Sequence, residues 1–353
     1  MRLSAKLTSA LFLFAALPAA AFEPARIDLV VTEAGQAYFS VSGTWPDTCP
    51  PRMTGMAVEG RDVSLLAARE TVGCRPTPTP YHLASTQSSL DELLPEAGTH
   101  RVRLQLEEDG RSAIAGFALV NAGALPGPAL ETGFWWAEQG GEFAAGPGLG
   151  LSVETQSGLV SLSVMGYDAH GASAWHFGAG EMDAGVAHLE LGQFEGGAGP
   201  LAAYVAPEAV RFSGFVDVEA ISPARAVLWF SRPDPETGLI DLRPLSIARF
   251  SVAQDPGEAL LGRWVLTGAD ADQRATRWLD FVRSEATESG FTLHDAGGAT
   301  LRCEAVPGLA GSPPALCRLD TGDGDIVEFT DIALRRLSGW DADAHRALAF
   351  RID

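Results

Sequence analysis

Apolar and polar residues alternate with a period of two along most of this chain. Residues 101–107 place one valine and two leucines on one face of an extended strand and charged or amide groups on the other. Asp109 and Gly110 follow, a dipeptide typical of a two-residue hairpin turn, and residues 113–120 supply the return strand. No long segment has the i, i+3, i+4 spacing of an amphipathic helix, and residues 89–96 are the best short helical candidate. The pattern therefore predicts an all-β protein.

Segments rich in proline and glycine divide the 353 residues into three regions. Residues 22–121 contain about seven candidate strands, the size of an immunoglobulin-like β-sandwich. After a linker at residues 122–129, residues 130–252 contain about eight candidate strands and residues 258–353 about seven. We therefore predict a sandwich followed by an eight-stranded β-barrel-like domain and a second, smaller β-barrel-like domain. The strands of the middle region are expected to start near Gly133, Gly148, Leu159, Ser173, Val186, Val210, Ala226 and Leu239.

The two predicted barrels open alike, with Gly133-Phe134-Trp135 in the first and Gly262-Arg263-Trp264 in the second. A Gly-x-Trp on a first strand followed by a meander resembles the opening of lipocalin and avidin barrels, whose tryptophan closes one barrel end. The resemblance implies meander barrels, and the strand counts support the same architecture independently.

The middle region also resembles a repeat of exported gammaproteobacterial proteins. That repeat has a Gly-x-Trp start, a Gly-x-Gly strand and then Tyr-Asp-x-x-Gly-x-x-x-Trp. The matching residues here are Gly133 to Trp136, Gly148 to Gly150, Tyr167 to Gly171, and Trp175. The resemblance covers about a third of the chain. It implies export and a β architecture, and it assigns no catalytic residue.

Residues 1–21 have the features of a cleaved signal peptide. Arg2 and Lys6 form a basic start, residues 7–16 are mostly apolar, and three alanines ending at Ala21 suit a signal peptidase. The apolar stretch is too short for a membrane span, and no later segment has eighteen apolar residues in a row. The sequence thus predicts a periplasmic or extracellular bacterial protein without a membrane span.

The charge balance excludes several classes of function. Lys+Arg is 25 against Asp+Glu 45, a net charge of −20. Removal of residues 1–21 leaves 23 basic against 45 acidic residues, a net charge of −22. Such a chain has no basic field to attract nucleic acid. Lys6 is the only lysine, which excludes a P-loop and a lysine Schiff base.

Four cysteines fit an oxidising compartment. Cys49 lies near Cys74, and Cys303 near Cys317, so the local one of three possible connectivities needs no bridge between regions. No CxxC or Cys/His spacing typical of zinc is present. We expect two disulfides, no metal and no cofactor.

Aromatic residues of the middle region are the candidate ligand-binding residues. An aromatic ring with a polar edge suits a sugar or a flat apolar ligand, but such rings also fill small barrels. Trp135 and Trp136 are adjacent, so they must point to opposite faces of one strand, and one of them lies outside the barrel. The full candidate set is Trp135, Trp136, Tyr167, Trp175, His176 and Trp229.

Other groupings have simpler explanations. The acidic residues of 320–325 could hold calcium, but a hairpin turn explains them equally well. His170 and His176 flank Asp168 across a predicted turn. These residue types could bind a metal, but a hairpin that happens to contain two histidines is the simpler explanation. No HExxH or Gly-x-Ser-x-Gly motif occurs, although a Ser-His-Asp triad is recognised by geometry rather than spacing.

The leading hypothesis is an exported, non-catalytic binding protein whose partner is a small molecule, a glycan or a surface protein. A secreted hydrolase on a β scaffold and a purely structural surface protein are the alternatives.

Overall fold

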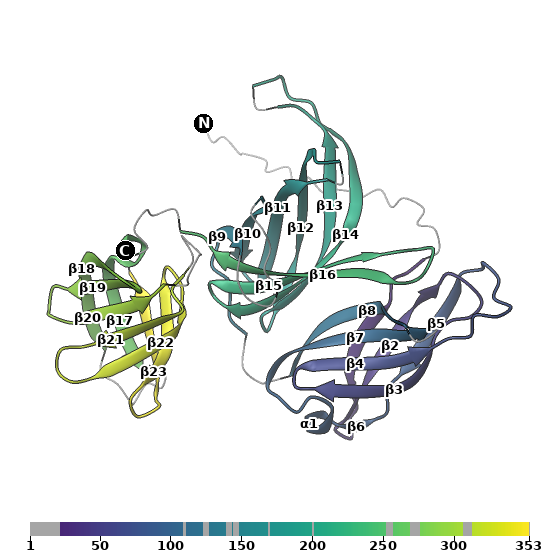
Figure 1. Cartoon of the computed structure of the whole chain (residues 1–353), viewed down its shortest axis with the longest axis horizontal. Helices are drawn as coiled ribbons and strands as arrows, with labels where there is room; N and C mark the ends of the chain where they lie inside the picture. The colour runs from purple at the N-terminus through teal and green to yellow at the C-terminus, as the bar shows by residue number, and fades with distance from the viewer. Residues whose placement is uncertain are drawn as a thin grey trace, which may run out of the picture.

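The computed structural model describes residues 22–108, 111–122, 127–138, 143, 148–168, 170–199, 201–251, 257–268, 276–305 and 313–352. The all-β prediction is confirmed: strands dominate these residues, which contain one short α-helix and one short 3₁₀ helix (Figure 1). The predicted signal peptide at residues 1–21 and the turn residues Asp109 and Gly110 lie outside the described residues.

The first region is a sandwich of two four-stranded sheets. One sheet contains β1 (Arg26–Val31), β2 (Gln36–Trp45), β5 (Thr79–Ala84) and β6 (Ser88–Ser89). The other contains β3 (Arg52–Glu59), β4 (Asp62–Ala68), β7 (Gly98–Glu108) and β8 (Arg111–Ala122). Phe39, Trp45, Leu65 and Leu104 belong to one core between them. β4 and β7 are parallel, whereas both sheets of an immunoglobulin sandwich are antiparallel.

The local predictions in this region agree with the structure. β7 and β8 pair antiparallel up to Glu108 and Arg111, as the alternation on either side of the predicted turn requires. The predicted helix is a single turn, α1 (Leu90–Leu93), whose N-cap Ser89 forms a capping box with Glu92. The helix ends early because Pro95 disfavours a helical conformation at Leu94.

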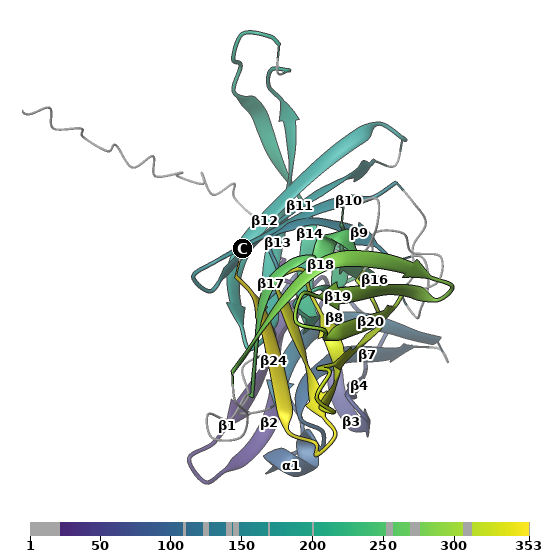
Figure 2. The ribbon, with the colours of Figure 1, turned by 90° about the vertical axis from the view of Figure 1, so that its left-hand side faces the viewer.

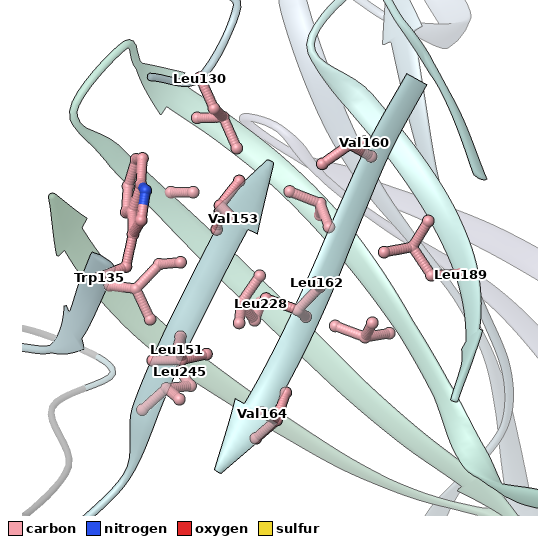
Figure 3. Close-up of a cluster of buried hydrophobic side chains, with 14 of the residues drawn as sticks. Leu130, Trp135, Leu151, Val153, Val160, Leu162, Val164, Leu189, Leu228 and Leu245 are labelled. Carbon is pink, nitrogen blue, oxygen red and sulfur yellow. The ribbon is translucent and has the colours of Figure 1, made fainter. Parts of the chain in front are cut away.

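The second region closes into a barrel of eight antiparallel strands. Its strands are β9 (Gly133–Ala137), β10 (Gly150–Gln156), β11 (Leu159–Tyr167), β12 (Ser173–Asp183), β13 (Val186–Gly196), β14 (Pro207–Ser222), β15 (Arg225–Pro233) and β16 (Ile240–Arg249). Each starts within three residues of its predicted position. Alternate residues such as Leu151, Leu162 and Leu228 fill the interior, so the barrel is packed (Figure 3).

The third region closes into another eight-stranded barrel, one strand more than predicted. An antiparallel meander closes only with an even number of strands, because its first and last strands must also be antiparallel. The 3₁₀ helix η1 (Glu258–Leu260) precedes the barrel. The strands are β17 (Gly262–Gly268), β18 (Arg277–Thr287), β19 (Gly290–Asp295), β20 (Thr300–Glu304), β21 (Leu316–Asp320), β22 (Ile326–Ile332), β23 (Arg336–Asp341) and β24 (Arg346–Arg351).

Both barrels use their Gly-x-Trp opening in the same way. Trp135 and Trp264 are fully buried, and each indole Nε1 donates to the carbonyl oxygen four residues earlier at 3.0 Å. Each tryptophan also pairs across strands with an arginine of the last strand, Arg249 in one barrel and Arg351 in the other. The two openings therefore have one structural role.

Contacts between the regions hold the three bodies together (Figures 1 and 2). The β15–β16 hairpin reaches over the sandwich, where a Cβ at Gly238 would come within 2.8 Å of the Trp45 ring. The Glu131 carboxylate accepts the backbone N–H groups of Leu334 and Arg335 at 3.0 and 2.8 Å, which ties the first barrel to the second.

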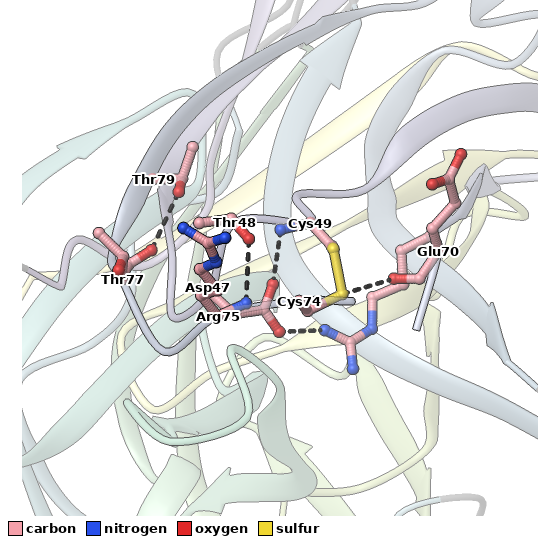
Figure 4. Close-up of a disulfide and its surroundings, with 9 residues drawn as sticks. Asp47, Thr48, Cys49, Glu70, Cys74, Arg75, Thr77 and Thr79 are labelled. Atoms are coloured by element: carbon pink, nitrogen blue, oxygen red, sulfur yellow. Dashed lines mark hydrogen bonds and ion pairs between the residues drawn. A yellow bond between two sulfur atoms is a disulfide. The ribbon is translucent and has the colours of Figure 1, made fainter. Parts of the chain in front are cut away.

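The predicted disulfide pairing is confirmed. Cys49 bonds Cys74 between two loops of the sandwich (Figure 4), and Cys303 bonds Cys317 across β20 and β21. The Asp47 carboxylate accepts the backbone N–H of Cys49 at 2.7 Å and an Arg69 N–H at 2.9 Å, which orders the first bridge. Disulfides persist in oxidising compartments, so they favour a location outside the cytoplasm.

Candidate functional site

The predicted aromatic residues separate into three environments. Trp135 belongs to the packed interior of the first barrel (Figure 3). Trp136 points outward from β9 beside Phe134 and Phe250, with ring centroids 6.2 and 5.8 Å from its own. One tryptophan of the adjacent pair therefore lies outside the barrel, as the period of two requires.

Tyr167 and Trp175 also point outward and are exposed, at 67% and 45% of their surfaces. Trp175 on β12 pairs across strands with Met165 on β11, and its ring lies 4.8 Å from that of Phe194 on β13. Phe194 in turn pairs with Val210 on β14. These contacts carry apolar side chains across four neighbouring strands.

The strand register joins these residues to the β9 cluster. Gly150 on β10 lies between Trp136 and Met165, and a Cβ there would come 3.1 Å from the Phe134 ring and 3.6 Å from the Met165 methyl carbon. Because residue 150 is glycine, the Phe134 and Met165 side chains can both lie over β10. With strands about 4.8 Å apart, the row from β9 to β14 is about 24 Å long.

We call this outer surface of the first barrel the aromatic wall. It consists of Phe134, Trp136, Met165, Tyr167, Trp175, Phe177, Phe194, Val210, Phe212 and Phe215. Glu154, Glu181 and Glu190 are exposed at outward positions of the same strands. The surface is therefore apolar at its centre and acidic around it.

His176 does not belong to the aromatic wall. It pairs with the inward Val164, and its Nδ1 lies 3.0 Å from the Ser213 Oγ. Ser213 donates to the Leu191 carbonyl oxygen at 3.2 Å, so its proton is directed away from the histidine. Burial lowers the pKa of His176, and the imidazole is neutral at pH 7.

Trp229 faces outward but is covered by the sandwich. Its ring stacks on Phe117 of β8 with centroids 4.9 Å apart, and its Nε1 donates to Glu219 at 2.9 Å. Arg101 of β7 donates to the same carboxylate at 3.1 and 3.4 Å and lies 5.0 Å from the Trp229 ring centroid. Trp229, a predicted ligand-binding residue, is thus buried in the interface between the sandwich and the first barrel.

A cleft of about 320 Å³ lies beside this interface. Its charged lining includes Arg101, Arg103, Glu59 and Asp62. Arg103 is paired with Asp62 at 2.7 Å, and Arg101 with the buried Glu219. These arginines already have anionic partners within the protein, so the cleft lacks the free cationic groups that an anionic ligand would need.

Sequence reasoning missed a histidine–aspartate pair in which the aspartate is buried and the histidine is exposed. His188 on β13 and Asp217 on β14 are register partners, with Nδ1 and Oδ1 2.8 Å apart. Burial raises the pKa of Asp217, and the hydrogen bond to Asp217 raises the pKa of His188. A single hairpin of alternating residues contains no local signal for this pair, because it depends on the register between the two strands.

No hydrogen bond between described side chains completes a Ser-His-Asp triad. His188 has its aspartate, and its ring stacks on Phe215 at 4.9 Å. His176 contacts a serine, Ser213, and burial lowers its pKa, whereas an acidic partner would raise it. Two further described histidines lie beside a carboxylate, His294 at 3.2 Å from Glu285 and His345 at 3.5 Å from Asp341.

The other candidate groupings are ordered turns. The Asp168 side chain accepts the backbone N–H groups of His170 and Ala172 at 2.8 and 2.9 Å. Arg277 donates twice to the Asp323 carboxylate, at 3.0 and 2.9 Å, and Thr321 also donates to Asp323. Hairpin geometry and an ion pair account for both groups of residues.

Comparisons with protein-family models, with curated proteins and with solved structures find no match for this chain. Among the described residues, no helix is long and apolar enough to cross a membrane.

Proposed function

We propose that this chain is an exported, non-catalytic interaction protein that binds another protein through the aromatic wall. The observation that carries the proposal is the continuous row of outward apolar side chains from β9 and from β11 to β14, which meet over Gly150 of β10. Phe212 and Trp175 are 51% and 45% exposed within a surface built from register partners. Monomeric soluble proteins rarely leave such a contiguous surface uncovered without a partner.

The composition of the wall favours a protein partner over a glycan. Phenylalanine predominates, and Met165 and Val210 are also present. Aromatic residues and methionine are enriched in protein interfaces, whereas a sugar needs a set of convergent hydrogen-bonding groups. The acidic surroundings favour basic residues around the apolar centre of the partner. They also oppose docking on an anionic lipid surface.

Export is supported by three independent features. The two disulfides favour an oxidising compartment, and residues 1–21 have the composition of a signal peptide. The repeat resemblance of the middle region points the same way. The catalytic alternative has weaker support, because the described His188 and His176 pairs are each incomplete as nucleophile–base systems.

Site-specific photo-crosslinking tests the proposal. A photoreactive phenylalanine derivative replaces Trp175 or Phe212 in the cells that produce the protein. Trp278, 67% exposed on β18 of the second barrel, is the matched control. We expect a protein adduct of one discrete mass from both wall positions and none from Trp278. Equal adducts at all three positions, adducts to lipid alone, or no adduct would contradict the proposal.

A further inference from the structure

The β13–β14 hairpin continues beyond the barrel and has a free edge (Figure 1). β14 pairs with β13 from Pro207 to Glu219, but it pairs with β15 only from Phe215 onward. Among the described strands, none pairs with the other edge of β14 before Phe215. Residues 207–212 are all exposed. Their outward backbone N–H and C=O groups therefore face solvent.

Two local features separate β14 from its neighbour. Ser213 is the extra residue of a β-bulge opposite Leu191 and Gly192. Gly214 has φ of +133°, and a Cβ there would come 2.6 Å from the Ser231 carbonyl oxygen on β15. Glycine at position 214 lets β14 and β15 approach closely where their pairing begins. On the N-terminal side of Gly214, the bulge bends β14 away from the barrel.

The free part of the hairpin has two different faces. Phe194, Val210 and Phe212 occupy the face that continues the aromatic wall. Glu195 and Arg211 occupy the opposite face, where they form an ion pair at 2.9 Å. An unpaired backbone edge thus lies beside an apolar face and a polar face.

We propose that the free edge of β14 binds an extended segment of the partner protein as an added β-strand. Main-chain hydrogen bonds to residues 208–212 would hold the segment, and its alternate apolar side chains would pack against Val210 and Phe212. This inference rests on the function proposed for the aromatic wall and specifies the form of the partner: an extended peptide with apolar residues at every second position and basic residues at its ends.

The unpaired backbone favours a polypeptide over a lipid, since a lipid tail forms no hydrogen bonds with a strand edge. Charge favours a different protein over a second copy. Each chain has a net charge of −20, and the exposed Glu190 and Glu208 lie on the paired strands of the hairpin. Two such edges would repel each other, whereas a segment with Arg or Lys at its ends would complement them.

The test uses the mature chain with both disulfides formed, and peptides selected on it from a random 12-residue display library. Successive N–H groups point to opposite edges of a strand. Ala209 and Val210 are consecutive register partners of Glu195 and Phe194. One of Ala209→Pro and Val210→Pro therefore removes a free-edge donor, and the other disrupts pairing with β13. Amide exchange in β13 identifies which variant leaves the hairpin intact. Phe212→Ser tests the apolar face.

We expect selected peptides to have apolar residues at alternate positions, to lose at least about tenfold in affinity with the free-edge proline variant, and to weaken with Phe212→Ser. Binding that is sensitive to Phe212→Ser but not to the free-edge proline overturns strand addition and leaves the proposed function standing. Binding sensitive to neither, or no selected peptide, contradicts both. A dimer of the unmodified chain that the free-edge proline dissociates assigns the edge to a second copy and overturns the inference.

Discussion

Residues of one type have different roles in this molecule, because the face of the strand decides what surrounds each side chain. Trp135 is packed inside the first barrel, its neighbour Trp136 contributes to the aromatic wall, and Trp229 is covered by the sandwich. The histidines differ in the same way. His188 is paired with an aspartate, whereas His100 is fully buried in the sandwich and its Nε2 has no partner among the described residues.

Burial lowers the pKa of His100 below 6.5, its value in the unfolded chain. The unfolded chain therefore binds more protons than the folded one as the pH falls below 6.5, and the free energy of unfolding decreases in that window. We expect urea denaturation of the sandwich between pH 7.5 and 5 to show this loss. His100→Gln should reduce the pH dependence.

His82→Gln is the matched control, because His82 is exposed on β5 of the same sandwich. An equal change of pH dependence in the two variants, or none with His100→Gln, would contradict the role of His100.

At the scale of elements, β7, β14 and β15 share a buried charge within the contact between the sandwich and the first barrel. The Glu219 carboxylate on β14 accepts from Arg101 on β7 and from the Trp229 indole on β15. Glu219 and Arg101 are largely buried, with 4% and 19% of their side chains exposed. Removing one charge of such a pair leaves the other without compensation, which costs more than losing an exposed ion pair.

Glu219→Gln should therefore destabilise the contact by about 3 kcal/mol, and amide exchange in β7, β8 and β15 should accelerate. Hydrogen exchange followed by mass spectrometry measures the exchange rates, and the free-energy change of the contact follows from them. Asp241→Asn removes an exposed partner of Arg243 on β16 and should change the free energy by less than about 1 kcal/mol. Unchanged exchange in Glu219→Gln would show that shape, rather than this charge pair, holds the bodies together.

At the scale of the whole molecule, three packed bodies leave the barrel wall and the β13–β14 hairpin uncovered. The sandwich covers β14 and β15 around Glu219 and Trp229, and the second barrel meets the first through Glu131. The aromatic wall lies mainly on β9 to β14, away from the contacts described for these two neighbours. The described contacts between the bodies therefore leave this surface available to a partner.

The mature protein should begin at Phe22 and carry both disulfides. N-terminal sequencing of protein from the cells that produce it should start at Phe22, and its intact mass should lie four hydrogens below that of the reduced protein, two for each disulfide. A mass that includes residues 1–21 would contradict cleavage. Alkylation of the unreduced protein should leave its mass unchanged, and an increase in mass under that treatment would contradict the disulfides.

Local pattern by itself determined much of this protein. The period of two located the strands of the first barrel and assigned Trp135 and Trp136 to opposite faces, because side-chain direction in a strand alternates regardless of its partners. Cysteine spacing determined the disulfide pairing, because each pair lies close along the chain. The net charge of −20 predicts that the chain does not bind nucleic acid, and that prediction depends only on composition.

Tertiary structure decided the rest of the candidate site. Trp136, Tyr167 and Trp175 share one surface, whereas Trp135 and His176 face inward and Trp229 is covered. Which side chains meet across strands depends on register, and register is set by long-range pairing that no single segment encodes. The same reason applies to the His188–Asp217 pair, to the parallel β4–β7 pair and to the free edge of β14, whose pairing with β15 begins only at Phe215.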